Sequence, residues 1–154
     1  MARLEYRQMD ENQTFPLLYY YEDIDLTEIA ARFACDYFVK AGVTYEKTSC
    51  ASQPPLYTIY VQQAEQQDWL DSGPSIRSGK GLRLELRQFL DNTAYFPEIH
   101  VFEISNNREL LLLLQSDYLY WLGQEWQKTS AEIDEDRQVY VYYAIPANGG
   151  SQDG

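Results

Sequence analysis

A run of five leucines at 110–114, preceded by a short apolar segment, constrains this chain more than any other feature. Residues 98–104 (EIHVFEI) carry apolar side chains at both alternating positions, which is typical of a strand covered on both faces. Asn106 is a candidate N-cap, and Glu109 three residues later completes a capping box. Leucine is not β-branched, so the run favours a helix over 107–122. The pattern predicts a central strand that leads into a buried helix.

This expected helix has no continuous polar face. At about 100° per residue, Gln115, Ser116 and Asp117 point in three separate directions. A helix that is apolar all round is either buried in a core or covered by a partner. Both alternatives stay open, and an interface there would include Tyr118, Trp121 and Trp126. The run is too short to cross a bilayer, which needs about 20 apolar residues.

Charge narrows the class of protein. The chain has 154 residues, enough for one domain, with a formal net charge of −12 and a pI of about 4.4. Such acidity argues against a nucleic-acid binder and against docking on anionic membranes, because both depend on Lys and Arg. The N-terminal residues lack the apolar segment of a secretory signal, and two cysteines, Cys35 and Cys50, suit a reducing compartment. We therefore expect a cytoplasmic protein.

The order of the predicted elements indicates an α+β fold. A capping box of Asp25 and Glu28 begins a helix over 26–41, which Gly42 ends. Strands are expected at 15–21, 43–50, 56–62, 82–89, 98–104 and 138–145, and an acidic loop at 129–136. The order β-α-β-β-β-β-α-β predicts a mainly antiparallel sheet of about six strands with two principal helices. We expect a single domain over 1–145, a disordered tail over 146–154 and no internal repeat.

The residues that carry chemistry form no recognisable catalytic or metal motif. A zinc site needs about four N or S ligands, and the chain has only one histidine, His100, and two cysteines. Cys35 is expected either on a second packing face of its helix or as an exposed thiol. Residues 73–80 superficially resemble a P-loop, but the glycine spacing and the following strand exclude one. We expect neither an enzyme nor a cofactor.

Four basic residues lie close together in an otherwise acidic sequence: Arg77, Lys80, Arg83 and Arg87. No acidic residue lies between Asp71 and Glu85. These side chains either bind an anion or an acidic partner, or they solubilise one sheet face and pair with nearby carboxylates.

The function favoured by these observations is binding or regulation through protein–protein contact, most simply as a homodimer. The 14 tyrosines support this class, because tyrosine combines an apolar ring with a polar tip and is enriched at interfaces, although it is also a good strand former. One alternative is a small-ligand-binding protein or enzyme with a pocket between residues 63–81 and the sheet. Another is an inhibitor or immunity-type protein that covers a basic target. The sequence fixes neither the partner nor the strand order.

Overall fold

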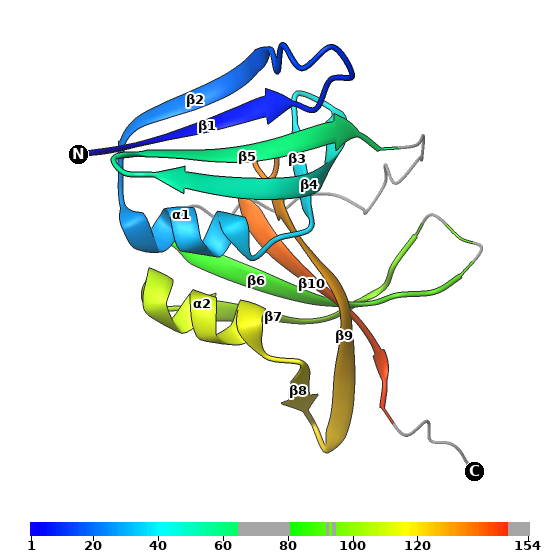
Figure 1. Cartoon of the computed structure of the whole chain (residues 1–154). Helices are drawn as coiled ribbons and strands as arrows, with labels where there is room; N and C mark the ends of the chain where they lie inside the picture. The colour runs from blue at the N-terminus through cyan, green and yellow to red at the C-terminus, as the bar shows by residue number, and fades with distance from the viewer. Residues whose placement is uncertain (65–80, 92, 94, 148–154) are drawn as a thin grey trace.

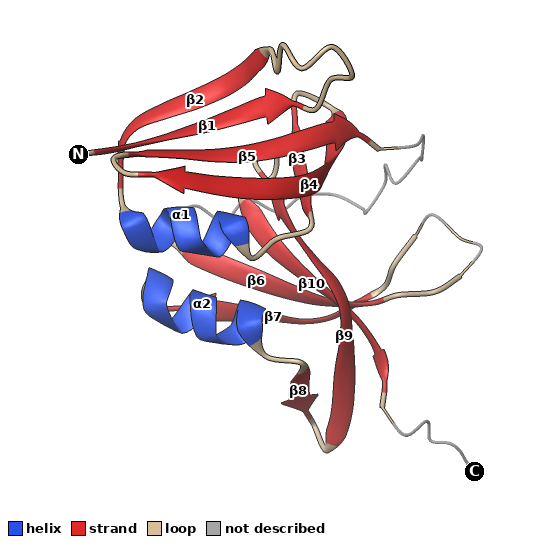
Figure 2. Cartoon of the chain, in the orientation of Figure 1, coloured by secondary structure: helices blue, strands red, loops and turns tan. Residues whose placement is uncertain are grey.

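The computed structural model describes residues 1–64, 81–91, 93 and 95–147, which form ten strands and two helices (Figures 1 and 2). In chain order the elements are β1 (Ala2–Gln8), β2 (Leu17–Ile24), α1 (Leu26–Phe33), β3 (Tyr37–Lys40), β4 (Val43–Gln53), β5 (Leu56–Gln63), β6 (Leu82–Gln88), β7 (Glu98–Ile104), α2 (Asn107–Gln115), β8 (Tyr118–Trp121), β9 (Gln124–Asp134) and β10 (Val139–Pro146). The strands form one sheet in the order β2-β1-β5-β4-β3-β9-β10-β6-β7, and β8 pairs with β9.

The expected fold class is wrong, because strands dominate the described chain and the sheet is mixed. Three of its pairings are parallel: β1 with β5, β6 with β10, and β3 with β9. The helices α1 and α2 contact each other and lie side by side between the part of the sheet around β1 and β5 and the part around β6 and β7 (Figure 1). None of the described helices has the length and apolar character needed to cross a membrane.

The chain contains the same structural unit twice. Residues 2–63 have the order ββαβββ, and residues 82–146 repeat it. In each unit the first strand is antiparallel to the second and parallel to the fifth, and the fourth is antiparallel to the third and the fifth. We call these units repeat 1 and repeat 2. The expectation of no internal repeat is therefore corrected by the structure.

Short stretches of matching sequence mark equivalent positions in the two repeats. Residues 3–8 read RLEYRQ and residues 83–88 read RLELRQ, while KTS occurs at both 47–49 and 128–130. Matching residues make matching contacts. The Nζ of Lys47 donates to the carbonyl of Phe33 at 2.5 Å, and the Nζ of Lys128 donates to the carbonyl of Leu114 at 2.6 Å. These stretches are the signal from which sequence reasoning could have found the duplication.

Both helices are shorter than predicted, because the residues that follow them form strands. Residues 37–40 leave the expected helix and pair with β4 and β9, and residues 118–121 pair with β9. The predicted helix starts are confirmed: Asp25 accepts a hydrogen bond from the amide of Thr27 at 3.0 Å, and Asn106 accepts one from the amide of Glu109 at 3.0 Å. A cap is local in sequence, whereas strand pairing depends on distant residues.

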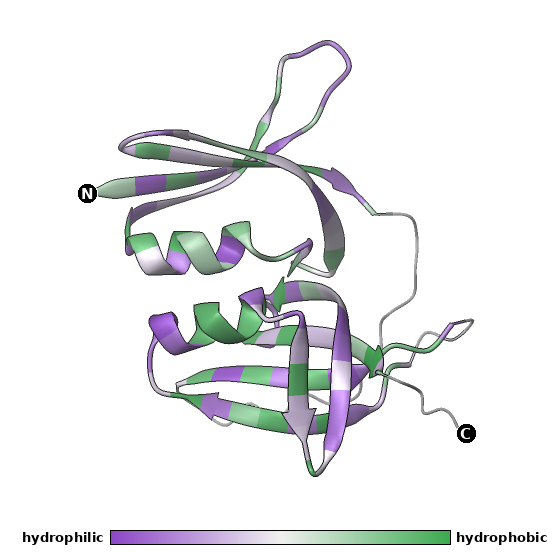
Figure 3. Ribbon diagram, turned by 60° about the horizontal axis from the view of Figure 1, so that its bottom comes forward, coloured by the Kyte–Doolittle hydropathy of each residue, from purple (hydrophilic) through white to green (hydrophobic). Residues whose placement is uncertain are grey.

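The described residues form two hydrophobic clusters, and the larger one spans both repeats. It includes Leu4 and Ile59 of repeat 1 and Leu84 and Tyr142 of repeat 2, together with buried leucines of α2. Figure 3 shows α2 as strongly hydrophobic where the two helices meet. Leu112 is 67% exposed, so α2 does have a solvent-facing side. The acidic run expected as a loop over 129–136 mostly belongs to the long strand β9.

Candidate functional site

Strand β3 joins repeat 1 to repeat 2. It pairs in parallel with the C-terminal end of β9, with Tyr37 opposite Glu132 and Val39 opposite Asp134. Asp36 extends this pairing, because its amide donates to the carbonyl of Ala131 at 2.7 Å and its carboxylate accepts from the amide of Ala131 at 2.9 Å. We call this parallel contact between β3 and β9 the joint.

A partly buried ionic group closes the joint beside the β9–β10 turn. The carboxylate of Glu135 pairs with Lys40 at 2.7 Å and Arg32 at 2.8 Å, and accepts a hydrogen bond from the hydroxyl of Tyr21 at 2.6 Å. Burial raises the pKa of Glu135, but the hydrogen bonds from Lys40 and Tyr21 and the charge of Arg32 outweigh it, so that this pKa lies below its ordinary value. Glu135 is therefore a charged anchor that holds three side chains of repeat 1.

Asp136, the next residue, anchors the turn between β3 and β4. Its carboxylate accepts hydrogen bonds from the amides of Ala41 and Gly42 at 2.8 and 2.9 Å. Both turn residues have positive φ, 54° and 76°, as a tight two-residue hairpin requires. Two adjacent carboxylates of repeat 2 thus hold the C-terminal end of β3 and the turn that follows it.

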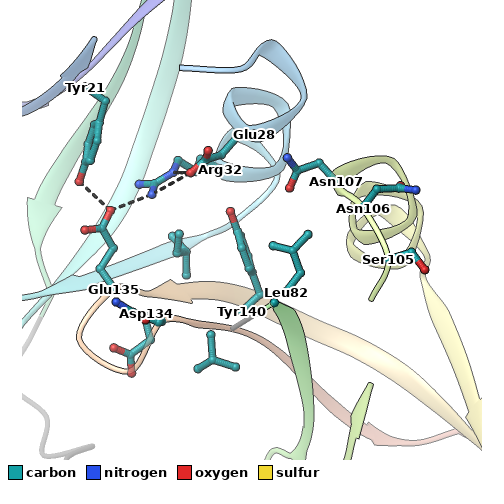
Figure 4. A pocket seen from close by; sticks show the side chains of 14 residues that line it. Tyr21, Glu28, Arg32, Leu82, Ser105, Asn106, Asn107, Asp134, Glu135 and Tyr140 are labelled. Carbon is teal, nitrogen blue, oxygen red and sulfur yellow. Dashed lines mark hydrogen bonds and ion pairs between the residues drawn. The ribbon is translucent and has the colours of Figure 1, made fainter. Parts of the chain in front are cut away.

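An open pocket of about 720 Å³ lies beside the joint (Figure 4). Both repeats line it, and Figure 4 shows the hydroxyl of Tyr140 pointing toward Arg32 from the opposite wall. Arg32 is already held by Glu28 at 3.3 Å and Glu135 at 2.8 Å, so its charge is compensated within the protein. The sequence predicted a pocket bordered by residues 63–81. Gly81 lines the observed pocket, and residues 65–80 lie outside the described residues. Part of the polar wall, formed by Arg32, Asp134 and Glu135, therefore lies beside the joint, while Ser105, Asn106 and Asn107 supply polar groups from the start of α2.

Strand β8 occupies in repeat 2 the position that β3 occupies in repeat 1, but it pairs on one side only within the described residues. In an antiparallel pair, alternate residues direct their N–H and C=O groups toward the partner. Leu119 and Trp121 face β9 in this way, so the backbone groups of Tyr118 and Tyr120 point outward. The side chains of Tyr118 and Tyr120 are 46% and 67% exposed. The outer edge of β8 therefore offers hydrogen-bonding groups between two exposed aromatic rings.

The edge of β8 is short, at four residues, but it carries no charge, proline or bulge, which are other features that protect edge strands. Strand β2, at one end of the sheet, carries Glu22 and Asp23, and Asp23 has a positive φ of 54°. Strand β7, at the other end, carries Glu98 and Glu103. Strand β8 reads YLYW and is followed by Leu122, which is 84% exposed. An unprotected edge of this kind is a template for an additional strand.

Trp121 replaces a cation that serves the joint in repeat 1. Its counterpart there is Lys40, whose Nζ lies 5.0 Å from the ring centroid of Tyr19 and binds Glu135. In repeat 2 the indole of Trp121 stacks on His100, the counterpart of Tyr19, with ring centroids 3.5 Å apart and an interplanar angle of 13°. The same position has therefore changed from a charged contact to an aromatic one.

The predicted anion-binding residues do not converge on one site in the described chain. Arg77 and Lys80 lie outside the described residues. Arg87 is buried, donating to the Glu85 carboxylate at 2.8 Å and to the Phe96 carbonyl at 2.7 Å. Its counterpart Arg7 makes the same two contacts in repeat 1, so this arginine serves the fold of each repeat. Arg83 is half-buried on β6.

The structure brings the three predicted interface residues together at β8 and β9. Tyr118 and Trp121 begin and end β8, while Trp126 is buried on β9 opposite Leu119. Tyr120 was missed by sequence reasoning and is the most exposed side chain of β8. The signal that could have found it is the matching Asp-Tyr pair at 36–37 and 117–118, which aligns β8 with β3.

Two side chains of types often used in catalysis, Cys35 and His100, are engaged in packing. The thiol of Cys35 is buried, which raises its pKa and keeps it protonated, and His100 is stacked on Trp121. Within the described residues, no three His, Cys, Asp or Glu side chains are grouped as metal ligands would be.

No protein-family model, curated protein or solved structure matches this chain. The fold and the site therefore define its class by geometry alone. It is a duplicated ββαβββ protein whose repeats share one mixed sheet, and within the described residues strand β8 of repeat 2 pairs on one side only.

Proposed function

We propose that this protein acts by binding another protein chain through strand addition at the outer edge of β8. The observation that carries this proposal is the outer edge of Tyr118–Trp121, which contains no charged residue and has no strand partner among the described residues, whereas its counterpart β3 is paired on both sides. In strand addition, main-chain hydrogen bonds supply affinity and neighbouring side chains supply specificity. Tyr118, Tyr120 and Leu122 would provide these side-chain contacts.

The charge distribution supports this choice of surface. The chain carries a net charge of −12, which opposes close approach of other acidic surfaces. The segment 118–123 contains no charged residue, so the strand itself adds no repulsion, although Asp117 precedes it and Glu125 accepts a hydrogen bond from the hydroxyl of Tyr120. Exposed aromatic side chains are also the residue type enriched where proteins meet.

The proposal is tested by measuring solution mass by light scattering, for the purified chain alone and after incubation with lysate of its host. The variant Tyr120→Lys places a charge on the outer edge of β8 without disturbing the core, because this side chain is 67% exposed. The matched control is Tyr20→Lys, since Tyr20 is an exposed tyrosine on the edge strand β2.

We expect the wild type and Tyr20→Lys to form a complex that Tyr120→Lys fails to form. A complex that forms equally well with Tyr120→Lys would show that another surface makes the contact. A wild-type chain that stays at its monomer mass of 18.0 kDa in both conditions would contradict the proposal as well.

A further inference from the structure

Each half of the joint occurs twice in the chain, but only one copy of each half is used. The strand that docks, β3, has its counterpart in β8. The edge that receives it, Glu132–Asp134 of β9, has its counterpart in Ala51–Gln53 of β4, because these residues face equivalent positions of β10 and β5. Within the described residues, Ala51–Gln53 pairs only with β5 and is exposed. Among the residues that the structure describes, one docking strand and one receiving edge therefore have no partner in the joint's manner.

The side chains around the two unused halves have changed from charged to apolar on both sides. In the joint, Arg32 and Lys40 of repeat 1 meet Glu135 of repeat 2. On the docking side, the counterparts of Arg32 and Lys40 are Leu113 and Trp121. On the receiving side, the β9–β10 turn with its two carboxylates is replaced by the turn Pro54-Pro55. Leu113 and Trp121 are half-buried and pack against the core of repeat 2, and Pro54 and Pro55 are exposed, so the two unused halves meet without the charges of the joint.

Two further residues fit a docking role for β8. Asp36, which binds Ala131 through both its amide and its carboxylate, is retained as Asp117, an exposed residue directly before β8. Leu112 of α2 is 67% exposed, whereas its counterpart on α1, Ala31, is fully buried. Repeat 2 therefore presents a hydrogen-bonding carboxylate and an uncovered leucine at positions that are occupied in repeat 1.

We propose that copies of this chain associate head to tail, with β8 of one copy pairing in parallel with Ala51–Gln53 of the next. The register follows the joint, so that Tyr118 lies opposite Ala51 and Tyr120 lies opposite Gln53. Asp117 of one copy then takes the role that Asp36 has toward Ala131, with Cys50 of the next copy as its backbone partner. This inference rests on the proposed function, because it names the partner of the same strand.

Such an interface is heterologous, because two different surfaces meet. Copies joined in this way either close into a ring or extend as an open chain, depending on the rotation between neighbours. The contact is weaker than the joint, because Pro54 has no N–H to replace the amide of Glu135, which donates to the carbonyl of Val39 at 2.9 Å. Association is therefore reversible and depends on protein concentration.

Disulfide cross-linking between two different variants tests the proposed register. One chain carries Tyr120→Cys and the other Gln53→Cys, both in a Cys50→Ser background that removes the half-buried thiol of the receiving strand. Neighbouring strands lie about 4.8 Å apart, within the range of Cα separations that a disulfide spans. Both substituted side chains are exposed, so neither variant disturbs the core. The matched control replaces Tyr120→Cys with Tyr20→Cys.

Under mild oxidation we expect a covalent dimer in the mixture of Tyr120→Cys with Gln53→Cys, and none in either variant alone or in the control mixture. A disulfide within Tyr120→Cys alone would show that β8 pairs with β8, which overturns the head-to-tail register but keeps β8 as the docking strand. Absence of any disulfide would overturn self-association. The proposed function itself then fails if the wild type forms no complex in lysate, or if Tyr120→Lys leaves that complex intact.

Discussion

Strands β3 and β8 hold the same position in two copies of one structural unit, yet one is covered and the other is exposed. Strand β3 pairs with β4 and β9 and is anchored by Glu135 and Asp136. Strand β8 pairs with β9 alone within the described residues, and its tyrosines face solvent. The local structure of the two strands is the same, so the difference lies in what surrounds them. Position in the fold alone does not decide whether an edge is covered.

Several contacts within repeat 1 have an equivalent within repeat 2. The contacts that join the two repeats have no such equivalent among the described residues. The lysine that binds the end of the helix occurs at both 47 and 128, and the arginine on the first strand of each repeat occurs at both 7 and 87. Glu135 and its partners Arg32 and Lys40 have no charged counterparts. Residues found in both repeats therefore maintain the unit, and residues found in one repeat determine what that repeat contacts.

The largest expected effect comes from breaking the joint with Glu135→Gln. This change leaves the buried cation of Arg32 with only the more distant carboxylate of Glu28, so we expect the free energy of unfolding to fall by about 3–5 kcal/mol. The measurement is urea denaturation of both proteins. The control is Glu125→Gln, because Glu125 accepts a hydrogen bond from the hydroxyl of Tyr120 at the exposed edge. Equal losses in the two variants would contradict the contrast between the joint and β8.

The next effect depends on pH and concerns Glu132, which faces Tyr37 across the joint and whose counterpart is Ala51. Burial and the charge of Asp134 raise the pKa of Glu132 from 4.5 to about 7. The folded state therefore keeps a proton that the unfolded state releases. This contribution to stability is fully present below pH 4.5 and is lost as pH rises through about 7.

Denaturation at pH 4.5 and pH 8 measures this loss. Relative to Glu132→Gln, the wild type is expected to lose about 3 kcal/mol of unfolding free energy across that interval. Glu103→Gln, an exposed carboxylate of β7, serves as the control and should follow the wild type. If the unfolding free energies of the wild type and Glu132→Gln change equally between pH 4.5 and pH 8, the carboxyl of Glu132 is not buried at the joint.

A smaller effect tests the contacts that the repeats share. Lys47→Met and Lys128→Met each remove a hydrogen bond to the last carbonyls of a helix, and both ammonium groups are only part-buried. We expect each variant to lose about 1 kcal/mol of unfolding free energy, with the two losses similar. If the two losses of unfolding free energy differ several-fold, the matching lysine contacts of the two repeats do not contribute equally to stability.

The smallest effect concerns the turns after β3 and β8. Ala41 and Leu122 have positive φ values of 54° and 50°, which asparagine adopts more readily than either residue. Leu122→Asn and Ala41→Asn should each raise the midpoint temperature of thermal unfolding. The expected gain in the free energy of unfolding is about 0.5–1 kcal/mol for each variant. Leu122→Asn should also weaken association, because it removes an exposed apolar side chain beside β8. A gain in stability without weaker association would exclude Leu122 from the interface.

Sequence reasoning located the starts of elements better than their ends. The caps at Asp25 and Asn106 are set by neighbouring residues and were predicted correctly. The helical spacing of Phe33, Tyr37 and Phe38 extended the first helix too far, because pairing of β3 with β4 and β9 overrides that pattern. The parallel pairings were also missed, because they join segments that are distant in the sequence.

The candidate site was predictable only in part. Tyr118 and Trp121 stood out because aromatic residues follow the leucine run, but they were expected on a helix. Their exposure on a strand edge follows from the duplication, which matching stretches such as RLEYRQ and RLELRQ already record. The role of Glu135 was hidden in an acidic run, because its importance comes from Arg32 and Lys40 of the other repeat.

Amide hydrogen exchange measured by NMR at low and high protein concentration compares β3 and β8 within one experiment. The Val39 amide lies on the side of β3 that faces β9 and should be protected equally at both concentrations. The Tyr120 amide should exchange quickly in dilute solution and become protected as concentration rises, because a second copy then covers the edge of β8. Fast exchange of Tyr120 at every concentration would contradict head-to-tail association, and protection of Tyr120 in dilute solution would contradict the unpaired edge itself.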